Sequence, residues 1–208
     1  VVIVCRNADA ARRRFGLVGD GVGVIFTRTG RRFFDDVVVE AELLGIVSRA
    51  LDRSELWERL ATEWVVLDCE LMPWSAKAQG LIRDQYAAVG AAASASLPDT
   101  VAALSTATLR GAGAEPLVDR FANRAVLVEK YISAYQRYCW PVSAVSDLRL
   151  APFHVLATEK VVHTDKDHEW HMRMASSMCE ADDSGVLSRT TYRTVDLTDP
   201  ASEAAATS

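Results

Sequence analysis

Two carboxylates stand at the end of an apolar stretch of the chain. Asp68 and Glu70 follow Trp64-Val-Val-Leu, a run typical of a buried strand. Side chains alternate along a strand, so the two carboxylates share one face. They are costly to bury without partners, and they can hold a divalent metal or accept hydroxyl groups from a ribose. The alternative is a structural ion pair with Arg28 or Arg32.

A basic turn is the second candidate. Arg28, Arg31 and Arg32 surround Gly30 in the segment Thr-Arg-Thr-Gly-Arg-Arg. Guanidinium groups gathered near a turn can bind phosphate oxygens in pairs. Taken alone, the segment favours a solvated basic hairpin over a phosphate-binding turn.

A histidine-rich segment is the third candidate. His163, His168 and His171 are interspersed with acidic residues. The spacing does not match HExxH, and capping and turn roles for Asp165 and Asp167 beside packed histidines are favoured over a zinc site. A metal-dependent hydrolase using Asp68, Glu70 and this segment is kept as an alternative function.

Composition limits the class of protein. The 208 residues are half hydrophobic and a quarter charged, which suits one soluble domain or one domain with an insertion. The net charge of −5 argues against a uniformly basic nucleic-acid binder, although residues 1–34 carry seven Arg against two Asp. Four dispersed cysteines predict reduced thiols in a cytoplasmic protein. The longest uncharged run, 85–98, is too short to span a bilayer.

The elements that must position these residues form a β-rich, helical, β-rich series. We predict strands at 1–5, 22–29, 65–70, 148–163 and 187–195, and helices at 37–47, 54–64, 76–96, 99–110, 116–138 and 168–178. The economical interpretation is an antiparallel α+β domain with a helical insertion. The predicted parts are 1–75, the insert module 76–138, and 139–208.

Eight segments form an ordered series along nearly the whole chain. They are VVIVCR (1–6), ARRRFG (11–16), FTRTGRRFF (26–34), LDCELMPWSAKAQ (67–79), YCWPV (138–142), LAPFHVLA (150–157), HEWHM (168–172) and VDLTDP (195–200). In this order they resemble the C-terminal ligase domain of bacterial polynucleotide kinase-phosphatase. The resemblance implies a DNA/RNA ligase-type nucleotidyltransferase fold, with antiparallel sheets, flanking helices and a helical insertion.

The resemblance also implies an activity. The family belongs to the covalent nucleotidyltransferases, in which a lysine attacks the α-phosphate of ATP, with Mg or Mn as the metal. It repairs RNA, so the implied partners are RNA ends, the kinase and phosphatase domains of the same parent chain, and an RNA 3′-terminal methyltransferase. A cytoplasmic location without a membrane, and a homodimer of the parent, are further expectations.

The family's motifs assign roles to matching residues. Glu70, in Asp68-Cys-Glu-Leu, is expected to contact the ribose, with Asp68 beside it in the nucleotide site. Phe153 is expected to stack on adenine, and Arg28, Arg31 and Arg32 to bind phosphate or RNA.

The resemblance also places other motifs outside this sequence. The lysine motif is expected upstream of Val1 and the last motifs after Ser208, and Lys77 lies in a different motif. No catalytic nucleophile is therefore expected within the chain, and we expect the chain alone to be inactive. A non-catalytic docking module for RNA-repair partners is the main alternative.

Overall fold

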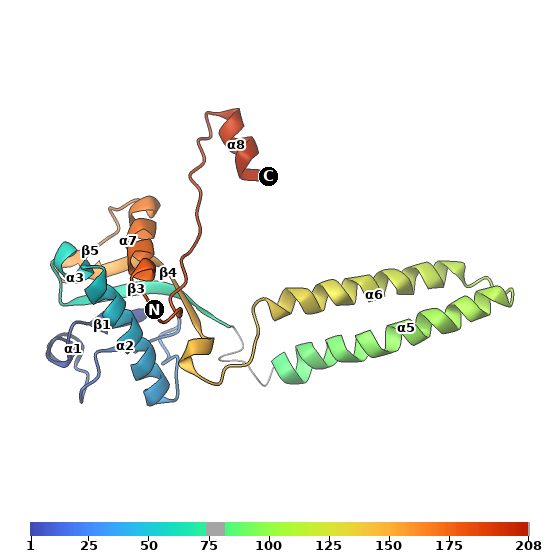
Figure 1. The fold of residues 1–208 in the computed structure, drawn as a ribbon, viewed down its shortest axis with the longest axis horizontal. Helices are drawn as coiled ribbons and strands as arrows, with labels where there is room; N and C mark the ends of the chain where they lie inside the picture. Colours follow the sequence, from blue (N-terminus) through green and yellow to red (C-terminus); the bar gives the residue numbers. More distant parts are fainter. Residues whose placement is uncertain (74–81, 208) are drawn as a thin grey trace. The chain divides into compact units, whose positions relative to one another are not determined.

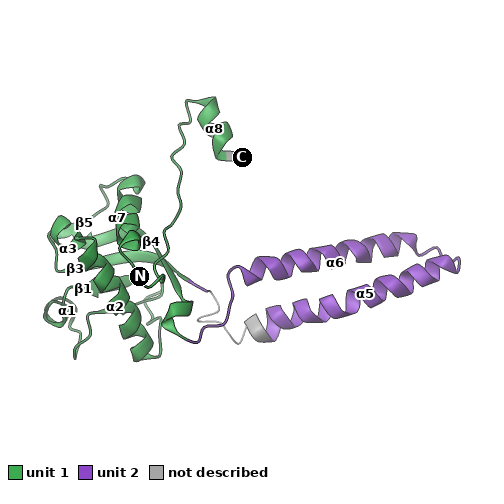
Figure 2. Ribbon diagram, in the orientation of Figure 1, with its two compact units in different colours: residues 1–71, 144–208 green, residues 72–143 purple. Residues whose placement is uncertain are grey.

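The chain divides into two compact units, seen in a computed structural model that describes residues 1–73 and 82–207 (Figures 1 and 2). The first unit joins residues 1–71 to 144–208, and the second comprises residues 72–143. The helical segment predicted at 76–138 falls within the second unit. The predicted catalytic and nucleotide-binding residues of the described chain all lie in the first.

A five-stranded sheet forms the centre of the first unit. Its order is β2-β1-β3-β4-β5, with β1 Val2–Cys5, β2 Gly23–Ile25, β3 Trp64–Met72, β4 Arg149–Thr158 and β5 Val161–Val162. Val2 pairs antiparallel with Ile25 on one side and with Leu67 on the other. The β-branched residues of β1 and β3 suit these central, doubly paired positions.

The first unit also contains helices, and several of them begin at a side-chain cap. They are α1 Ala8–Phe15, α2 Val37–Arg53, α3 Leu56–Arg59, α7 His168–Glu180 and α8 Pro200–Thr207, with the 3₁₀ turn η2 Val145–Asp147. The side chains of Asn7, Asp36 and Asp167 accept backbone N–H groups at the starts of α1, α2 and α7. The capping role predicted for Asp167 is therefore confirmed.

The core of the first unit has two parts. The larger contains the fully buried side chains of α2, α3, α7 and the strands, among them Leu43, Trp57 and Met172. A smaller cluster joins α1 to β1 and β3 through Cys5, Ala11 and Trp64, with the Phe15 ring edge-on to Trp64. The first half of β3, Trp64–Leu67, is thus mostly buried, whereas the second half, which carries the carboxylates Asp68 and Glu70, is more exposed.

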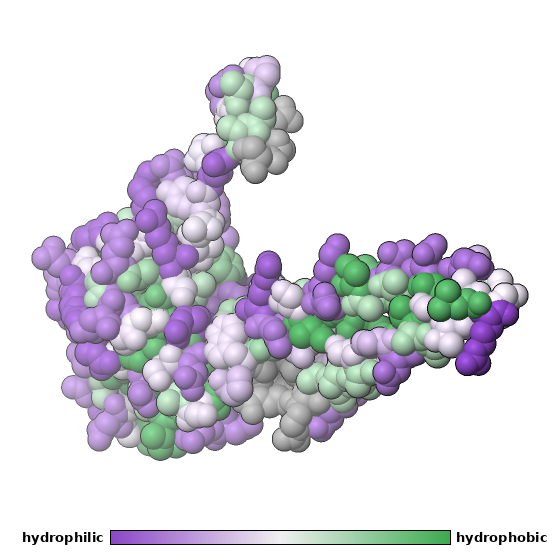
Figure 3. Space-filling model, turned by 45° about the vertical axis from the view of Figure 1, so that its right-hand side comes forward, coloured by the Kyte–Doolittle hydropathy of each residue, from purple (hydrophilic) through white to green (hydrophobic). Residues whose placement is uncertain are grey.

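The second unit is a helical hairpin. The π-helical turn η1 Ile82–Ala87 leads into α5 Ala88–Leu109, which packs along α6 Glu115–Gln136. Figure 3 shows apolar side chains along this hairpin, and Val89, Leu109 and Leu127 are exposed. The stretch Asp84–Leu109 is long and apolar enough to cross a membrane by length and composition alone, with 6% of its apolar window buried.

Several predicted elements differ from the observed ones in the N-terminal part. Residues 8–15 form α1, for which no helix was predicted, because Asn7 caps a run of alanines and arginines. The strand expected at 22–29 covers only Gly23–Ile25, since the chain then folds into the basic turn. The helix expected at 54–64 is limited to α3, because Trp64 pairs with Cys5 and begins β3.

Two further differences occur later in the chain. A break was expected between helices at Pro98, but α5 continues through this residue while it packs against α6. The strand expected at 187–195 is wrong, because only Leu187 forms an isolated bridge, with Leu150. The bridge consists of two backbone hydrogen bonds, from the Leu150 N–H to the Val186 carbonyl and from the Ser188 N–H to the Leu150 carbonyl. Both errors arose where tertiary contacts override the local pattern.

Candidate nucleotide-binding site

The carboxylate pair lies in the second half of β3, after the mostly buried residues Trp64–Leu67. Strand alternation places Asp68 and Glu70 on the face that also carries Trp64 and Val66. Asp68 is 22% exposed and Glu70 is exposed. Cys69, between them, faces the other way toward α7, where burial and the nearby Cys179 raise its pKa. The pair is thus accessible to a ligand while its strand is anchored in the core.

Arg28 is the cation that faces this pair. Its guanidinium Nη2 lies 3.8 Å from Asp68 Oδ2, and its side chain is 83% exposed. The turn that carries it is closed by hydrogen bonds from Thr27 N–H to the Arg31 carbonyl and from Gly30 N–H to the Thr27 carbonyl, at 2.7 and 2.9 Å. Gly30 supplies the left-handed φ of 81° that the turn needs. A largely solvated, separated pair of this kind leaves both groups able to bind a ligand.

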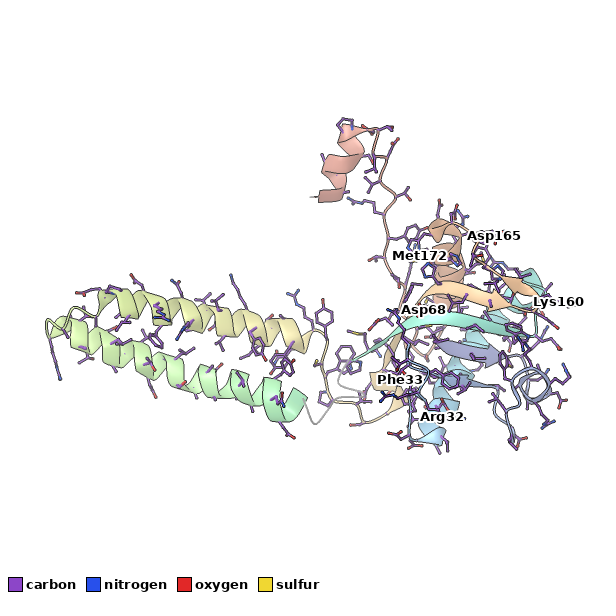
Figure 4. All side chains as sticks on the ribbon, turned by 180° about the vertical axis from the view of Figure 1, so that it is seen from behind. Arg32, Phe33, Asp68, Lys160, Asp165 and Met172 are labelled. Carbon is purple, nitrogen blue, oxygen red and sulfur yellow. The ribbon has the colours of Figure 1, made fainter. Side chains whose placement is uncertain are left out.

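Arg32 has a different environment from Arg28 and Arg31. It forms a 3.0 Å ion pair with Glu40, whose carboxylate is only 7% exposed and also accepts the Ile25 N–H at 2.9 Å. The pair ties the basic turn to α2 (Figure 4). Arg31 is exposed beside it. The structure therefore places Arg28 beside the carboxylates and gives Arg32 a structural partner.

The start of β1 lies at the same end of the sheet. Continuing the β1 register by one residue places Val1 between Phe26 and Asp68. The Phe26 N–H donates to the Val1 carbonyl at 2.9 Å, and the Val1 amine donates to the Phe26 carbonyl at 2.8 Å. Val1, the residue before β1, thus lies between the Arg28 turn and the Asp68 strand.

Phe153 lies on β4, the neighbour of β3. The Glu159 N–H, after the end of β4, donates to Thr62 Oγ1, before the start of β3, at 2.9 Å. The two strands therefore run in opposite directions, and the half of β4 that holds Phe153 lies beside the half of β3 that holds Glu70. The ring is partly buried and contacts His154, with centroids 5.3 Å apart. The Phe153 ring and the carboxylates of Asp68 and Glu70 thus lie at the same end of the sheet.

The histidine-rich segment is packed into the fold. His163 Nε2 is 2.9 Å from Thr158 Oγ1, and His171 Nδ1 accepts the Val155 N–H at 3.2 Å. Burial lowers the pKa of both histidines. Within the part of the chain that the structure describes, no group of three or more His, Cys, Asp or Glu side chains could hold a metal ion. The packed, hydrogen-bonded arrangement favoured from the sequence is the one observed.

The described lysines of the first unit lie away from the carboxylates, and the other described lysine belongs to the second unit. Lys130 is on α6, Lys160 follows β4 at the opposite end of the sheet from Asp68 (Figure 4), and Lys166 pairs with Asp165 at 2.9 Å. Lys77, the fourth lysine of the sequence, lies outside the described residues. Among residues 1–73 and 144–207, no lysine accompanies Glu70 at its end of the sheet.

Two residues of the site environment were missed in the sequence. Glu40 was counted only as part of a helix, although a carboxylate among apolar residues, eight positions after Arg32, could have indicated a buried partner for an arginine. His154 was read as part of a strand, yet its ring lies 4.7 Å from that of His171. No local signal indicates that contact, because it depends on how α7 docks on β4.

Comparison with known proteins identifies the family. A search of curated proteins finds no match. The family model described as PNKP adenylyltransferase domain, ligase domain, matches residues 1–208. The α+β fold with its antiparallel sheet agrees with a ligase-type nucleotidyltransferase. The chain therefore belongs to the PNKP adenylyltransferase, or ligase, domain family.

Proposed function

We propose that this chain is the ATP-binding part of an RNA-sealing adenylyltransferase domain. The observation that carries the proposal is the meeting of Asp68, Glu70, Arg28 and Phe153 at one end of the sheet, in a chain of the adenylyltransferase family. Each group suits one part of the nucleotide. A flat apolar ring can stack on adenine, carboxylates accept ribose hydroxyls, and a guanidinium binds phosphate oxygens.

The roles of individual residues follow from exposure and position. Glu70 accepts the ribose hydroxyl groups, since it is the more exposed carboxylate on the strand next to Phe153. Phe153 stacks on the base. Arg28 moves from its 3.8 Å contact with Asp68 to the phosphates, at little cost because the pair is largely solvated.

Magnesium or manganese fits the same face. Mg²⁺ commonly takes one or two protein carboxylates together with nucleotide phosphate oxygens, and Asp68 could provide one of them. When bound, the ion neutralises negative charge on the phosphates. Asp68 would then be released from Arg28 toward the ion.

The nucleophilic lysine of the complete domain lies upstream of Val1 in this proposal. Residues before β1 would emerge between the Arg28 turn and Asp68, which is where a lysine would meet the phosphates of a nucleotide held by Glu70 and Phe153. The 208-residue chain alone therefore binds ATP without forming a lysyl-adenylate and without sealing RNA.

The wider setting is a bacterial, cytoplasmic RNA-repair protein. RNA ends are the acceptor in this proposal, and exposed Arg28 and Arg31 are the groups that contact the RNA backbone. The kinase and phosphatase domains of the parent chain, an RNA 3′-terminal methyltransferase and a second copy of the parent are its proposed partners.

Calorimetric titration of the chain with ATP and Mg²⁺ tests the proposal. We expect Glu70→Ala and Phe153→Ala each to weaken binding by about tenfold, the cost of a lost charged hydrogen bond or aromatic stack. Glu42→Ala, at an exposed position of α2, and Phe121→Ala, on α6, are the matched controls and should bind as the wild type does. No binding by the folded wild type would contradict the proposal and favour the docking-module alternative.

A further inference from the structure

All four histidines of the chain lie in one cluster between β4 and α7. Their rings form a continuous series of contacts with Trp170. His154 lies 4.7 Å from His171 and 5.2 Å from His168, and Trp170 lies 5.0 Å from His171 and 4.9 Å from His163. Phe153 continues the series through His154, at 5.3 Å. The residue proposed to stack on adenine is therefore the outer end of this aromatic series.

His171 is the member that connects the two elements by a hydrogen bond. It lies in the first turn of α7 and is 6% exposed, and its Nδ1 accepts the N–H of Val155 on β4 at 3.2 Å. A backbone N–H can only donate, so Nδ1 must carry no proton. Protonation of the ring would place two donors face to face and would remove this acceptor of the Val155 N–H.

Val155 lies two residues after Phe153 on the same strand. We propose that His171 is a pH-sensitive positioning residue, whose neutral imidazole holds the Val155 amide and so fixes the Phe153 segment of β4 for nucleotide binding. The inference rests on the proposed function, because it assigns the Phe153 segment to the nucleotide. His171 itself contacts no substrate in this account and acts through β4.

The groups facing His171 all favour its neutral form except one backbone contact. Burial lowers its pKa most, and the positive charges that His154, His163 and His168 can carry lower it further, whereas a hydrogen bond with the His163 backbone raises it. Two arginines of neighbouring helices contact the C-terminal end of α7, far along the helix from His171. Arg59 of α3 donates to Ser177, and Arg53 of α2 donates to the Ala181 carbonyl. The hydrogen bond is thus intact at neutral pH and is lost on acidification.

ATP titrations between pH 8 and pH 5.5 test this role with three variants. His171→Asn retains an acceptor near the position of Nδ1 but cannot titrate, and His171→Leu retains bulk without an acceptor. His168→Asn is the control, because His168 is an exposed member of the same cluster whose contact with β4 is to the His154 side chain, at 3.4 Å, rather than to the strand backbone. At pH 8 we expect wild type, His171→Asn and His168→Asn to bind alike and His171→Leu to bind about tenfold more weakly.

At pH 5.5 the wild type and His168→Asn should lose about tenfold in affinity, whereas His171→Asn should lose less than twofold. Equal losses in His171→Asn and wild type would overturn the proposal. Hydrogen exchange at the Val155 amide is the second readout, and it also applies if His171→Leu does not fold. Protection of this amide should fall with acidification in the wild type and stay constant in His171→Asn.

The exchange readout separates this inference from the proposed function. If the wild type binds no ATP but the protection of the Val155 amide changes with pH as described, the proposed function fails, while the pH-dependent hydrogen bond between His171 and Val155 is supported. If ATP binds and the Val155 amide shows no pH-dependent protection, His171 is not a positioning residue, and the nucleotide site stands without it.

Discussion

At the scale of single residues, arginines of one basic turn have different environments. Arg28 is 83% exposed and only 3.8 Å from a partly exposed carboxylate, whereas Arg32 binds a carboxylate that is 7% exposed. A buried carboxylate that loses its partner keeps its desolvation cost, but a solvated one does not. The two arginines should therefore differ in stability and in ligand binding.

Alanine substitution of each arginine checks this difference. Arg32→Ala should lower the free energy of unfolding by about 1–2 kcal/mol, a value reduced from that of a fully buried pair because Arg32 is half exposed. Arg28→Ala should change it by less than about 0.5 kcal/mol and should weaken ATP binding by about fivefold. Urea denaturation and calorimetry provide the two measurements. The reverse pattern would show that Arg32, not Arg28, serves the ligand.

The placement of single side chains was predictable from the sequence where it follows from the local backbone geometry. The shared face of Asp68 and Glu70 follows from strand alternation, and the Arg28–Asp68 contact was one of the two pairings proposed. The pairing of Arg32 with Glu40 was missed: the pattern around Glu40 could indicate a buried partner for an arginine, but which arginine it binds depends on the docking of α2 against β2. The assignments of Glu70 and Phe153 to a nucleotide came from the family resemblance and stay predictions.

At the scale of elements, the close pairing of the edge strand β2 with β1 depends on one glycine, Gly23. Gly23 of β2 pairs with Val4, and a Cβ at this position would lie 2.1 Å from the Ile3 carbonyl oxygen. Gly21, two residues earlier, has nothing within 4 Å of an added Cβ. Because β2 leads directly into the basic turn, its pairing with β1 positions Arg28.

Replacing each of these glycines by alanine tests the close approach. Gly23→Ala should destabilise the chain by about 2 kcal/mol or more, since backbone must move to relieve the overlap. Gly21→Ala should leave stability unchanged within about 0.5 kcal/mol. Thermal unfolding followed by circular dichroism compares the two variants. Equal melting temperatures would show that β2 does not pack against β1 as described.

Elements with a strong internal pattern were predicted well. The helices starting at Val37 and His168 and the strand around Phe153 carry their own periodicity, and all three begin within one residue of the predicted position. The helix from Val37 continues to Arg53, beyond its predicted end, and the strand stops at Thr158, before its predicted end. The helix α1 was not predicted, because its formation depends on capping by Asn7. The strand predicted at 187–195 was wrong, because this segment forms only a single bridge, to Leu150. Pairing partners distant in sequence leave no local signal.

At the scale of the whole molecule, acid should destabilise the fold through its histidines. The folded-state pKa values of His163 and His171 lie below the ordinary value of 6.5, mainly because burial disfavours their charged forms. Unfolded chains therefore bind more protons at these sites. The stabilisation is complete above about pH 6.5 and is lost as the pH falls through the lowered values.

Melting temperatures between pH 8 and pH 5 measure this linkage. They should be constant at the alkaline end and fall below about pH 6.5. Asp182 and Asp196, whose pKa values are lowered by hydrogen bonds, remain ionised in this range and should not contribute. The double variant His163→Asn/His171→Asn should show a flatter profile. A melting temperature that rises on acidification would contradict the account.

The central proposal is that this chain holds ATP at the Asp68, Glu70 and Phe153 end of its sheet and forms no lysyl-adenylate. Equilibrium dialysis with α-labelled ATP and Mg²⁺, followed by denaturing gel electrophoresis of the same sample, tests both parts. We predict label bound to the native wild type, less bound to Glu70→Ala, and no label on the denatured chain. Absence of bound label before denaturation, or a labelled protein band after it, would contradict the claim.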